Sequence, residues 1–203
     1  MAIITTWRVK IIRSWSCIFG ATALFHIVGV TPEAKTKFDV LMPGLYTVWK
    51  ISYEEMIQAY SELSNQQSGP IDAVVFGSPH LSVLELSTLA KLTKGRRSHP
   101  NVDFIVTTSR YAYHEAQKLG IISVLERFGI RCLTDTCSCF LDIPTIPEKA
   151  NIILTQSAKY AHYGPGLLQK KVYIASVVDC VESAVSGYYS PKVPEWMRKE
   201  FWL

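Results

Sequence analysis

The sequence predicts an α/β fold, a mostly parallel sheet with helices on both faces. Short apolar runs alternate along the chain with segments that carry apolar residues at helical spacing. Two of these segments open with a Ser-x-x-Glu capping box, which marks the start of a helix. Strands that alternate with helices form β-α-β units, so their sheet is parallel and covered on both faces.

The expected strands are short runs of mainly apolar residues. They lie at residues 23–30, 72–76, 102–107, 130–133, 151–154 and 172–175. Thr31 and Pro32 end the first of them, and a turn at residues 77–80 (GSPH) is expected to end the second. The aromatic, proline-containing tail at residues 188–203 is expected to pack on the surface or against a partner.

The expected helices occupy the intervals between strands. They lie at residues 52–63, 82–94, 109–128 and 179–185. Ser52 and Ser82 begin the first two helices, because a glutamate follows each serine three residues later. Ser109 can cap the third helix, which is expected to break near Gly120 and to end before Gly129.

The apolar run at residues 14–30 has two interpretations. Arg8, Lys10 and Arg13 precede it, as in a signal peptide or a short membrane anchor. The run lacks a small-x-small cleavage site, however, and His26 lies deep inside it. The competing interpretation is that its second half is a buried core strand.

Composition favours a globular protein and argues against several classes of function. The 203 residues are 48% hydrophobic and 19% charged, with a net charge of +4. The basic clusters at residues 94–97 (KGRR) and 170–171 indicate solvated loops rather than a nucleic-acid site. The sequence contains no dinucleotide fingerprint, Walker loop, nucleophile elbow or His-Glu-x-x-His motif, so nucleotide-dependent and common hydrolase functions lack support.

The five cysteines indicate reduced thiols in a cytoplasmic protein. Their number is odd, and three of them lie within eight residues, unlike a secreted disulfide framework. Cys137-Ser138-Cys139 is a C-x-C sequence with no second cysteine pair, which disfavours a structural zinc site.

Polar side chains follow several of the expected strands. They occur at residues 77–80, 107–109, 134–137 and 155–163. Parallel strands end at one common edge of a sheet, and ligands of α/β proteins bind at that edge. The sequence therefore predicts a small-molecule site there.

Two cysteines are candidate ligands of a metal or cluster. Cys137 follows a strand, beside Asp135 and two hydroxyl groups, and thiolates bind iron–sulfur clusters and zinc. Its alternative role is that of a small buried hydrophobic residue. Cys180 lies at the expected start of a helix, where the helix dipole lowers a thiol pKa.

Four further residues are candidates for the substrate side of the site. His80 follows a Gly-Ser-Pro turn and could donate to a carboxylate or phosphate, or could simply bond to backbone. Ser157, Lys159 and Tyr163 lie in one loop or short helix, and a helical turn would place Lys159 and Tyr163 on one face. The lysine suits an anionic substrate, although it could instead be only solvated.

Five ordered motifs resemble the aconitase X family. They are ALFHIVGVTPEA at 23–34, GSPHLSVLEL at 77–86, TDTC at 134–137, SAKYAHYGPG at 157–166 and DCVESAVSG at 179–187. On this basis we divide the chain into an atypical segment 1–19, a domain portion 20–187 and the tail 188–203. The resemblance also favours a core strand at residues 23–30 over a signal peptide.

The resemblance implies an aconitase-like layered domain and a hydro-lyase that removes water from a hydroxy acid. It implies an iron–sulfur cluster as cofactor, with a four-iron cluster favoured over a two-iron cluster. Family members combine a large subunit with a small swivelling subunit, as separate or fused chains. We therefore expect a small anionic hydroxy-acid substrate and the small subunit as partners, and neither nucleic acid nor a membrane.

Known family activities are dehydration of phosphomevalonate in the mevalonate route of isoprenoid biosynthesis and of cis-3-hydroxy-L-proline. The first is favoured here because no small-subunit sequence is fused to this chain. The resemblance implies Cys137 as a metal ligand, Ser78 and Cys180 as further cofactor-binding residues, and His80, Ser157, Lys159 and Tyr163 as catalytic residues.

Two departures from the family pattern support an alternative function. The chain has about half the length of a typical large subunit and matches its C-terminal half. Ser78 stands where family members commonly carry a cysteine, and a serine there would weaken a cluster. The alternative is a truncated, non-catalytic remnant of the family.

Overall fold

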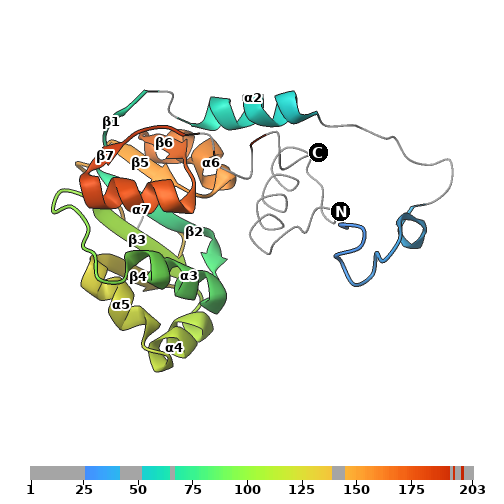
Figure 1. Cartoon of the computed structure of the whole chain (residues 1–203), viewed down its shortest axis with the longest axis horizontal. Helices are drawn as coiled ribbons and strands as arrows, with labels where there is room; N and C mark the ends of the chain where they lie inside the picture. The colour runs from blue at the N-terminus through green and yellow to red at the C-terminus, as the bar shows by residue number, and fades with distance from the viewer. Residues whose placement is uncertain are drawn as a thin grey trace. The chain divides into compact units, whose positions relative to one another are not determined.

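The computed structural model describes residues 26–41, 52–64, 67–138, 145–192, 194 and 198 (Figure 1). The chain divides into two compact units, Met1–Met56 and Ile57–Leu203. Only the second contains a sheet among the residues described, and the candidate site lies in it. Within the described ranges no helix has both the length and the apolar character needed to cross a bilayer.

The first unit contains a short 3-10 helix, η1 (Lys37–Asp39), which Thr36 and Asp39 cap reciprocally. Residues 26–30 do not form the expected strand, and residues 28–30 form a turn instead, so that prediction is wrong over these residues. The turn is closed by Thr31, whose backbone N–H donates to the Ile27 carbonyl at 2.8 Å and whose hydroxyl accepts from the Ile27 N–H at 2.8 Å. Residues 14–25 lie outside the described part of the chain.

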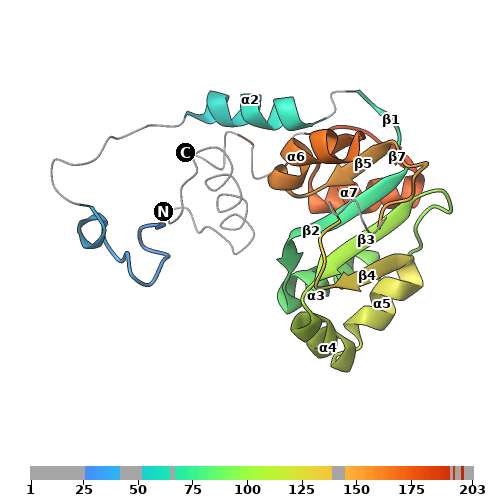
Figure 2. The same cartoon turned by 180° about the vertical axis from the view of Figure 1, so that it is seen from behind.

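A five-stranded, wholly parallel sheet organises the second unit (Figure 2). Its order is β4-β3-β2-β5-β6, with β2 in the centre. The strands are β2 (Ala73–Leu81), β3 (Asp103–Thr108), β4 (Ile130–Thr134), β5 (Ile152–Thr155) and β6 (Lys171–Ile174). A separate antiparallel pair joins β1 (Gly69–Pro70) to β7 (Tyr188–Tyr189). The parallel α/β fold predicted from the sequence is confirmed.

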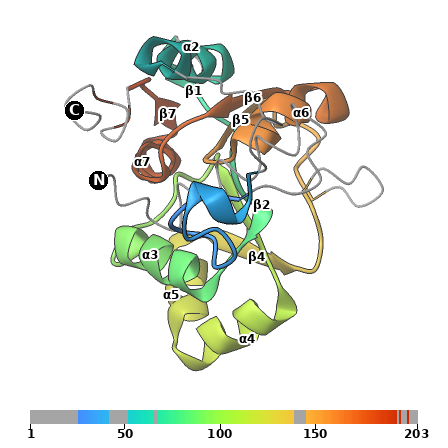
Figure 3. The ribbon, with the colours of Figure 1, turned by 90° about the vertical axis from the view of Figure 1, so that its right-hand side faces the viewer.

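Helices cover both faces of this sheet (Figure 3). They are α3 (Val83–Thr93), α4 (Arg110–Lys118), α5 (Ile121–Phe128), α6 (Ala158–Leu168) and α7 (Val177–Ser186). Helices α3, α5 and α7 pack on one face through a core that includes Val74 and Phe76, whereas α6 packs on the other face, against Ala73 and Val75. Neighbouring residues of β2 thus face opposite layers, as the pleat of a strand requires.

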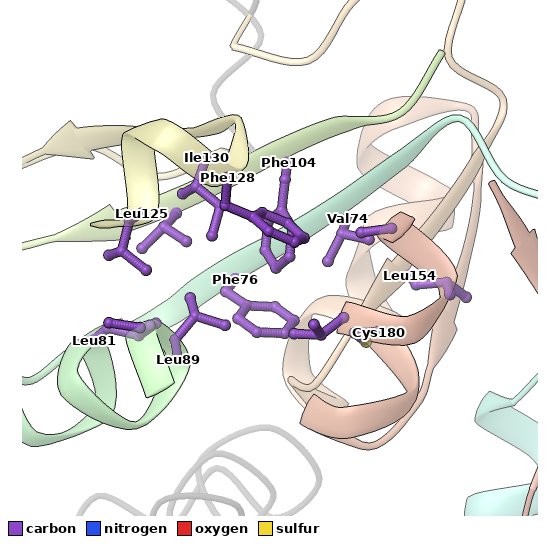
Figure 4. Packing of buried hydrophobic residues seen from close by; sticks show 14 of the residues in the cluster. Val74, Phe76, Leu81, Leu89, Phe104, Leu125, Phe128, Ile130, Leu154 and Cys180 are labelled. Carbon is purple, nitrogen blue, oxygen red and sulfur yellow. The ribbon is translucent and has the colours of Figure 1, made fainter. Parts of the chain in front are cut away.

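Aromatic side chains fill the core beneath α3, α5 and α7 (Figure 4). The Phe104 ring lies between two others, with its centroid 5.1 Å from that of Phe76 and 6.0 Å from that of Phe128. Both pairs meet edge to face, the geometry that aromatic quadrupoles prefer. The three rings bind the strands β2 and β3 to helix α5.

Most expected helices form where their local signals lie. Helix α2 (Tyr53–Leu63) follows the Ser52 capping box, and α3 follows that of Ser82. The third helix breaks at Gly120 and ends at Gly129, and both glycines have left-handed backbone angles. Residues 77–80 are different, because they continue strand β2 with a register shift between Phe76 and Leu81 instead of forming the expected turn.

Gly77 lies where strand β2 comes close to Thr107 of β3. Its φ is +125°, and a Cβ at this position would lie 2.5 Å from the carbonyl oxygen and 2.7 Å from the nitrogen of Thr107. The Thr107 hydroxyl also donates to the Gly77 carbonyl at 2.8 Å. No side chain therefore fits between β2 and β3 here without displacing the backbone.

We expect Gly77→Ala to lower the free energy of unfolding by at least about 2 kcal/mol, because the methyl group overlaps backbone and forces an unfavourable φ. Gly166→Ala is the matched control, since no atom lies within 4 Å of the added Cβ. The control should stabilise α6 by about 0.5–1 kcal/mol. Equal effects of the two substitutions in urea unfolding would contradict this account of Gly77.

Candidate functional site

The carboxyl ends of the strands lie at one edge of the sheet, as parallel pairing requires. Thr134 at the end of β4 is in register with Thr108 at the end of β3, and Thr108 pairs in turn with Leu81 at the end of β2. The ends of β2, β3, β4 and β5 therefore converge. Ser78 and His80 lie in the last part of β2, Cys137 and Ser157 in the loops after β4 and β5, and Lys159 and Tyr163 in α6. The remaining candidate, Cys180, lies inside α7.

His80 links the end of β2 to the loop after β4. Its Nε2 lies 2.7 Å from the carbonyl oxygen of Thr136. A carbonyl oxygen can only accept a hydrogen bond, so Nε2 carries the proton and donates to the Thr136 carbonyl. The contact fixes the residue that directly precedes Cys137, and His80 itself is only half buried.

Ser157 links the same part of β2 to helix α6. Its hydroxyl donates to the Ser78 carbonyl and accepts from the Tyr160 N–H at 3.2 Å, as an N-cap does. Both serines are buried, with 6% of Ser157 and 8% of Ser78 exposed. The hydroxyl of Ser157 is thus engaged in holding α6 against the sheet edge.

Asp135 anchors the loop after β4 from the other side. Its carboxylate accepts from the Arg110 N–H at 2.9 Å and forms an ion pair with the guanidinium at 2.9 Å. The backbone hydrogen bond from Arg110, followed by the charges of Arg110 and His80, lowers the pKa of Asp135. The residue adopts a positive φ of 52°, and its own N–H donates to the Thr108 carbonyl at 3.0 Å.

Arg110 is the residue of this edge that the sequence did not single out. It begins α4, directly after the cap at Ser109 and the end of β3. It directly follows a predicted strand and its cap, and this position could have indicated a residue at the carboxyl edge. The partner carboxylate lies 25 residues further along the chain, which no local pattern reveals.

Cys137 is held between these anchors. It is half buried, and the neighbouring Ser138 is 2% exposed. Among the described residues the Ser138 hydroxyl has no hydrogen-bond partner, whereas its carbonyl accepts from the Thr145 hydroxyl at 3.4 Å. Cys137 thus precedes a residue with a buried, unpaired hydroxyl in the loop at the carboxyl edge.

The described residues do not by themselves fit an iron–sulfur cluster. Nowhere in the described ranges do three His, Cys, Asp or Glu side chains gather as a metal site would require. Cys132 lies within β4 and packs against the core, where burial raises the pKa of its thiol to about 12. Cys139 lies outside the described ranges. One thiol at the edge, that of Cys137, is too few for a cluster.

Cys180 does not have the environment that the sequence predicted. Helix α7 begins at Val177, so Cys180 lies one turn inside it and is 0% exposed. Its side chain lies with those of Phe76 and Leu154 in the core (Figure 4). Burial, with a smaller contribution from Asp179, raises the pKa of the thiol. The expectation of a lowered pKa is wrong, because loss of solvation outweighs the helix dipole.

Lys159 and Tyr163 lie one helical turn apart on α6, which extends through the segment expected as a loop or short helix. Both residues are exposed, and the Tyr163 ring meets that of His162 edge to face with centroids 5.0 Å apart. Among the described residues Lys159 has no acidic partner. Close to the N-terminus of α6, its charge is available to an anion at the sheet edge.

This arrangement can bind and orient a small anion. A lysine, an imidazole, hydroxyl groups and one thiol surround the carboxyl edge, on loops that hydrogen bonds from His80, Ser157 and Asp135 hold in place. Proton transfer and carboxylate binding are both within the chemistry of this set.

Comparison with known proteins gives consistent matches. The model of the aconitase X third domain matches residues 71–186. Over 189 residues the chain is 41% identical to a cis-3-hydroxy-L-proline dehydratase of Hypocrea jecorina, covering 90% of this chain and 32% of that protein. A protein of the same name from Pseudomonas aeruginosa is 39% identical, over 89% of this chain and 31% of that protein.

More distant matches extend this pattern. The phosphomevalonate dehydratase large subunit of Methanocaldococcus jannaschii is 27% identical, over 80% of this chain and 39% of that protein. The crystal structure of Thermococcus kodakaraensis aconitase X in its holo form superimposes with a TM-score of 0.55 at 24% identity, over 64% of this chain and 33% of that one, and so shares the fold. The chain thus spans about a third of the length of these proteins.

Proposed function

Since the chain belongs to the aconitase X family, we propose that it forms part of a dehydratase acting on a small anionic hydroxy acid. The observation that carries this proposal is the convergence of His80, Cys137, Ser157 and Lys159 at one sheet edge. The relatives named as dehydratases add support, as they match most of this chain. The rest of the active site would come from the two thirds of those proteins that this chain does not span.

We favour cis-3-hydroxy-L-proline over phosphomevalonate as the type of substrate. Two relatives named for the first substrate share 39–41% identity with this chain, whereas those named for the second share 25–30%. This order reverses the preference drawn from the sequence. Relatives named as large subunits support a small subunit as partner.

In this proposal the chain's own residues bind and orient the substrate. Lys159 pairs with the substrate carboxylate, and the Tyr163 phenol, on the same helical face, donates a further hydrogen bond. His80 holds the loop at Thr136 in the geometry that binding needs, and Ser157 does so for the start of α6. Each donates a hydrogen bond to a backbone carbonyl. Positioning of this kind lowers the entropic cost of reaching the transition state.

Cys137 is proposed to give one thiolate to an iron–sulfur cluster, with the other donors outside the described residues. Ser78 lies at the same edge, where it is 8% exposed and its carbonyl accepts from Ser157. When bound, such a cluster would supply a Lewis acid for the leaving hydroxyl group.

The first test is turnover by the complete protein that contains this chain. We expect the protein to remove water from cis-3-hydroxy-L-proline and to leave phosphomevalonate unchanged. Chromatography of the product would measure the reaction. Turnover of phosphomevalonate alone would reverse the substrate assignment. A protein loaded with iron that dehydrates neither compound would instead support the non-catalytic alternative.

Lys159→Met should raise the KM for the hydroxy acid roughly 10- to 150-fold, since a charge-assisted hydrogen bond contributes about 1.5–3 kcal/mol. Lys159→Arg should recover most of the loss. Lys171→Met is the control, because it removes an exposed charge at the start of β6 on the opposite edge. If Lys159→Met leaves KM unchanged, the lysine is merely solvated.

Cys137→Ala should remove most of the bound iron from anaerobically purified protein, measured by metal analysis and visible absorbance. Cys132→Ala and Cys180→Ala should keep their iron, because both thiols lie against the core. Thermal melting of all three variants would separate loss of iron from loss of fold. Full iron content in Cys137→Ala would exclude this cysteine as a ligand.

A further inference from the structure

A basic pocket lies at the amino edge of the sheet, opposite the candidate site. Its volume is about 400 Å³. It is lined mainly by Thr93, Lys94, Arg96, Arg97, Val124 and Arg127. Four of these side chains are cationic and none is acidic, in a protein whose net charge is only +4.

The fold brings the cations together from two separate segments, one after α3 and one at the end of α5. Lys94, Arg96 and Arg97 follow α3 and precede β3, whereas Arg127 lies in the last turn of α5, before β4. The Ser98 N–H donates to the Phe128 carbonyl at 2.8 Å and so joins the two segments. The pocket is thus a product of tertiary structure rather than of the sequence KGRR alone.

A close contact between Gly129 and the Ser98 side chain reinforces this junction. Gly129 has a φ of +110°, and a Cβ there would collide with the Ser98 hydroxyl. The turn at Lys94 is closed by its N–H, which donates to the Ala90 carbonyl at 3.0 Å. These contacts hold together the two segments that line the pocket.

Most of the positive charge in the pocket is not compensated. Arg96 is neutralised, because its two terminal nitrogens each donate to Glu182 at 2.7 Å. Lys94 and Arg97 are exposed and have no acidic partner among the described residues. Arg127 donates from its Nε to the Ser123 carbonyl at 3.0 Å, a bond that does not use its terminal nitrogens.

The helix ends next to the pocket offset only part of this charge. Helices α3 and α5 both end there, and a helix C-terminus carries roughly half a negative charge. Three uncompensated cations therefore leave a net positive pocket. Four of the residues that line the pocket carry cationic side chains, which favours an anionic ligand.

We propose that this pocket binds a small polyvalent phosphate, such as a diphosphate or a phosphorylated metabolite. Guanidinium groups match phosphate oxygens in a two-pronged geometry, and lysine adds a point charge. The volume is sufficient for two phosphoryl groups and a small attached group. This site is distinct from the proposed dehydration site, which lies at the other edge of the sheet, and does not depend on it.

The test is calorimetric titration of the full chain with inorganic pyrophosphate at low and at physiological ionic strength. We expect saturable binding that weakens as salt rises. The double variant Lys94→Gln/Arg97→Gln should weaken binding at least about tenfold, since it removes two charge-assisted contacts. Neither side chain has an ion-pair partner among the described residues, so the fold should persist, as thermal melting would verify.

Lys171→Gln is the control for general charge, because it removes one exposed cation at the distant strand β6. Binding should be unaffected by this change, and an equal loss in control and double variant would overturn the proposal. Absence of saturable pyrophosphate binding would also overturn it. In that event, binding of an acidic peptide to the wild type but not to the double variant would assign the pocket to a protein partner.

Discussion

Parallel pairing of β2 with β3 on one side and with β5 on the other is the constraint on which the rest of the structure depends. It places the ends of all five strands at one edge and their beginnings at the other. The two functional regions that we propose follow from this polarity. The segments at the carboxyl edge carry hydroxyl, imidazole, thiol and amine groups, whereas the segments that precede β3 and β4 carry guanidinium groups.

Hydrogen bonds to backbone carbonyls turn the carboxyl edge into a defined surface. His80 donates to the Thr136 carbonyl and Ser157 to the Ser78 carbonyl, so the end of β2, the loop after β4 and the start of α6 are joined. The Asp135 carboxylate adds α4 to this set by accepting from the Arg110 N–H. Such groups appear reactive in a sequence, yet here they serve first to hold neighbouring loops, because a buried carbonyl left without a donor costs free energy.

The sequence predicted the features that depend on local chemistry. The capping boxes at Ser52 and Ser82 located two helices, and the glycines at 120 and 129 located a break and an end. It failed at residues 77–80, where Gly-Ser-Pro suggests a turn but pairing of Leu81 with Thr108 continues the strand. The burial of Cys180 and the bond between His80 and Thr136, 56 residues apart, depend on tertiary packing, which a single sequence does not reveal.

The break at Gly120 matters for the dimensions of the domain. An unbroken helix from Arg110 to Phe128 would be about 28 Å long, whereas strand β3 with its six residues measures roughly 20 Å. A single straight helix between β3 and β4 would extend past the end of the sheet. The start of β4 would then lie beyond the start of β3, with which it pairs. Division into two short helices, of about 14 Å for α4 and about 12 Å for α5, keeps each of them shorter than the strand. The first residue of α4 then stays at the edge beside Asp135.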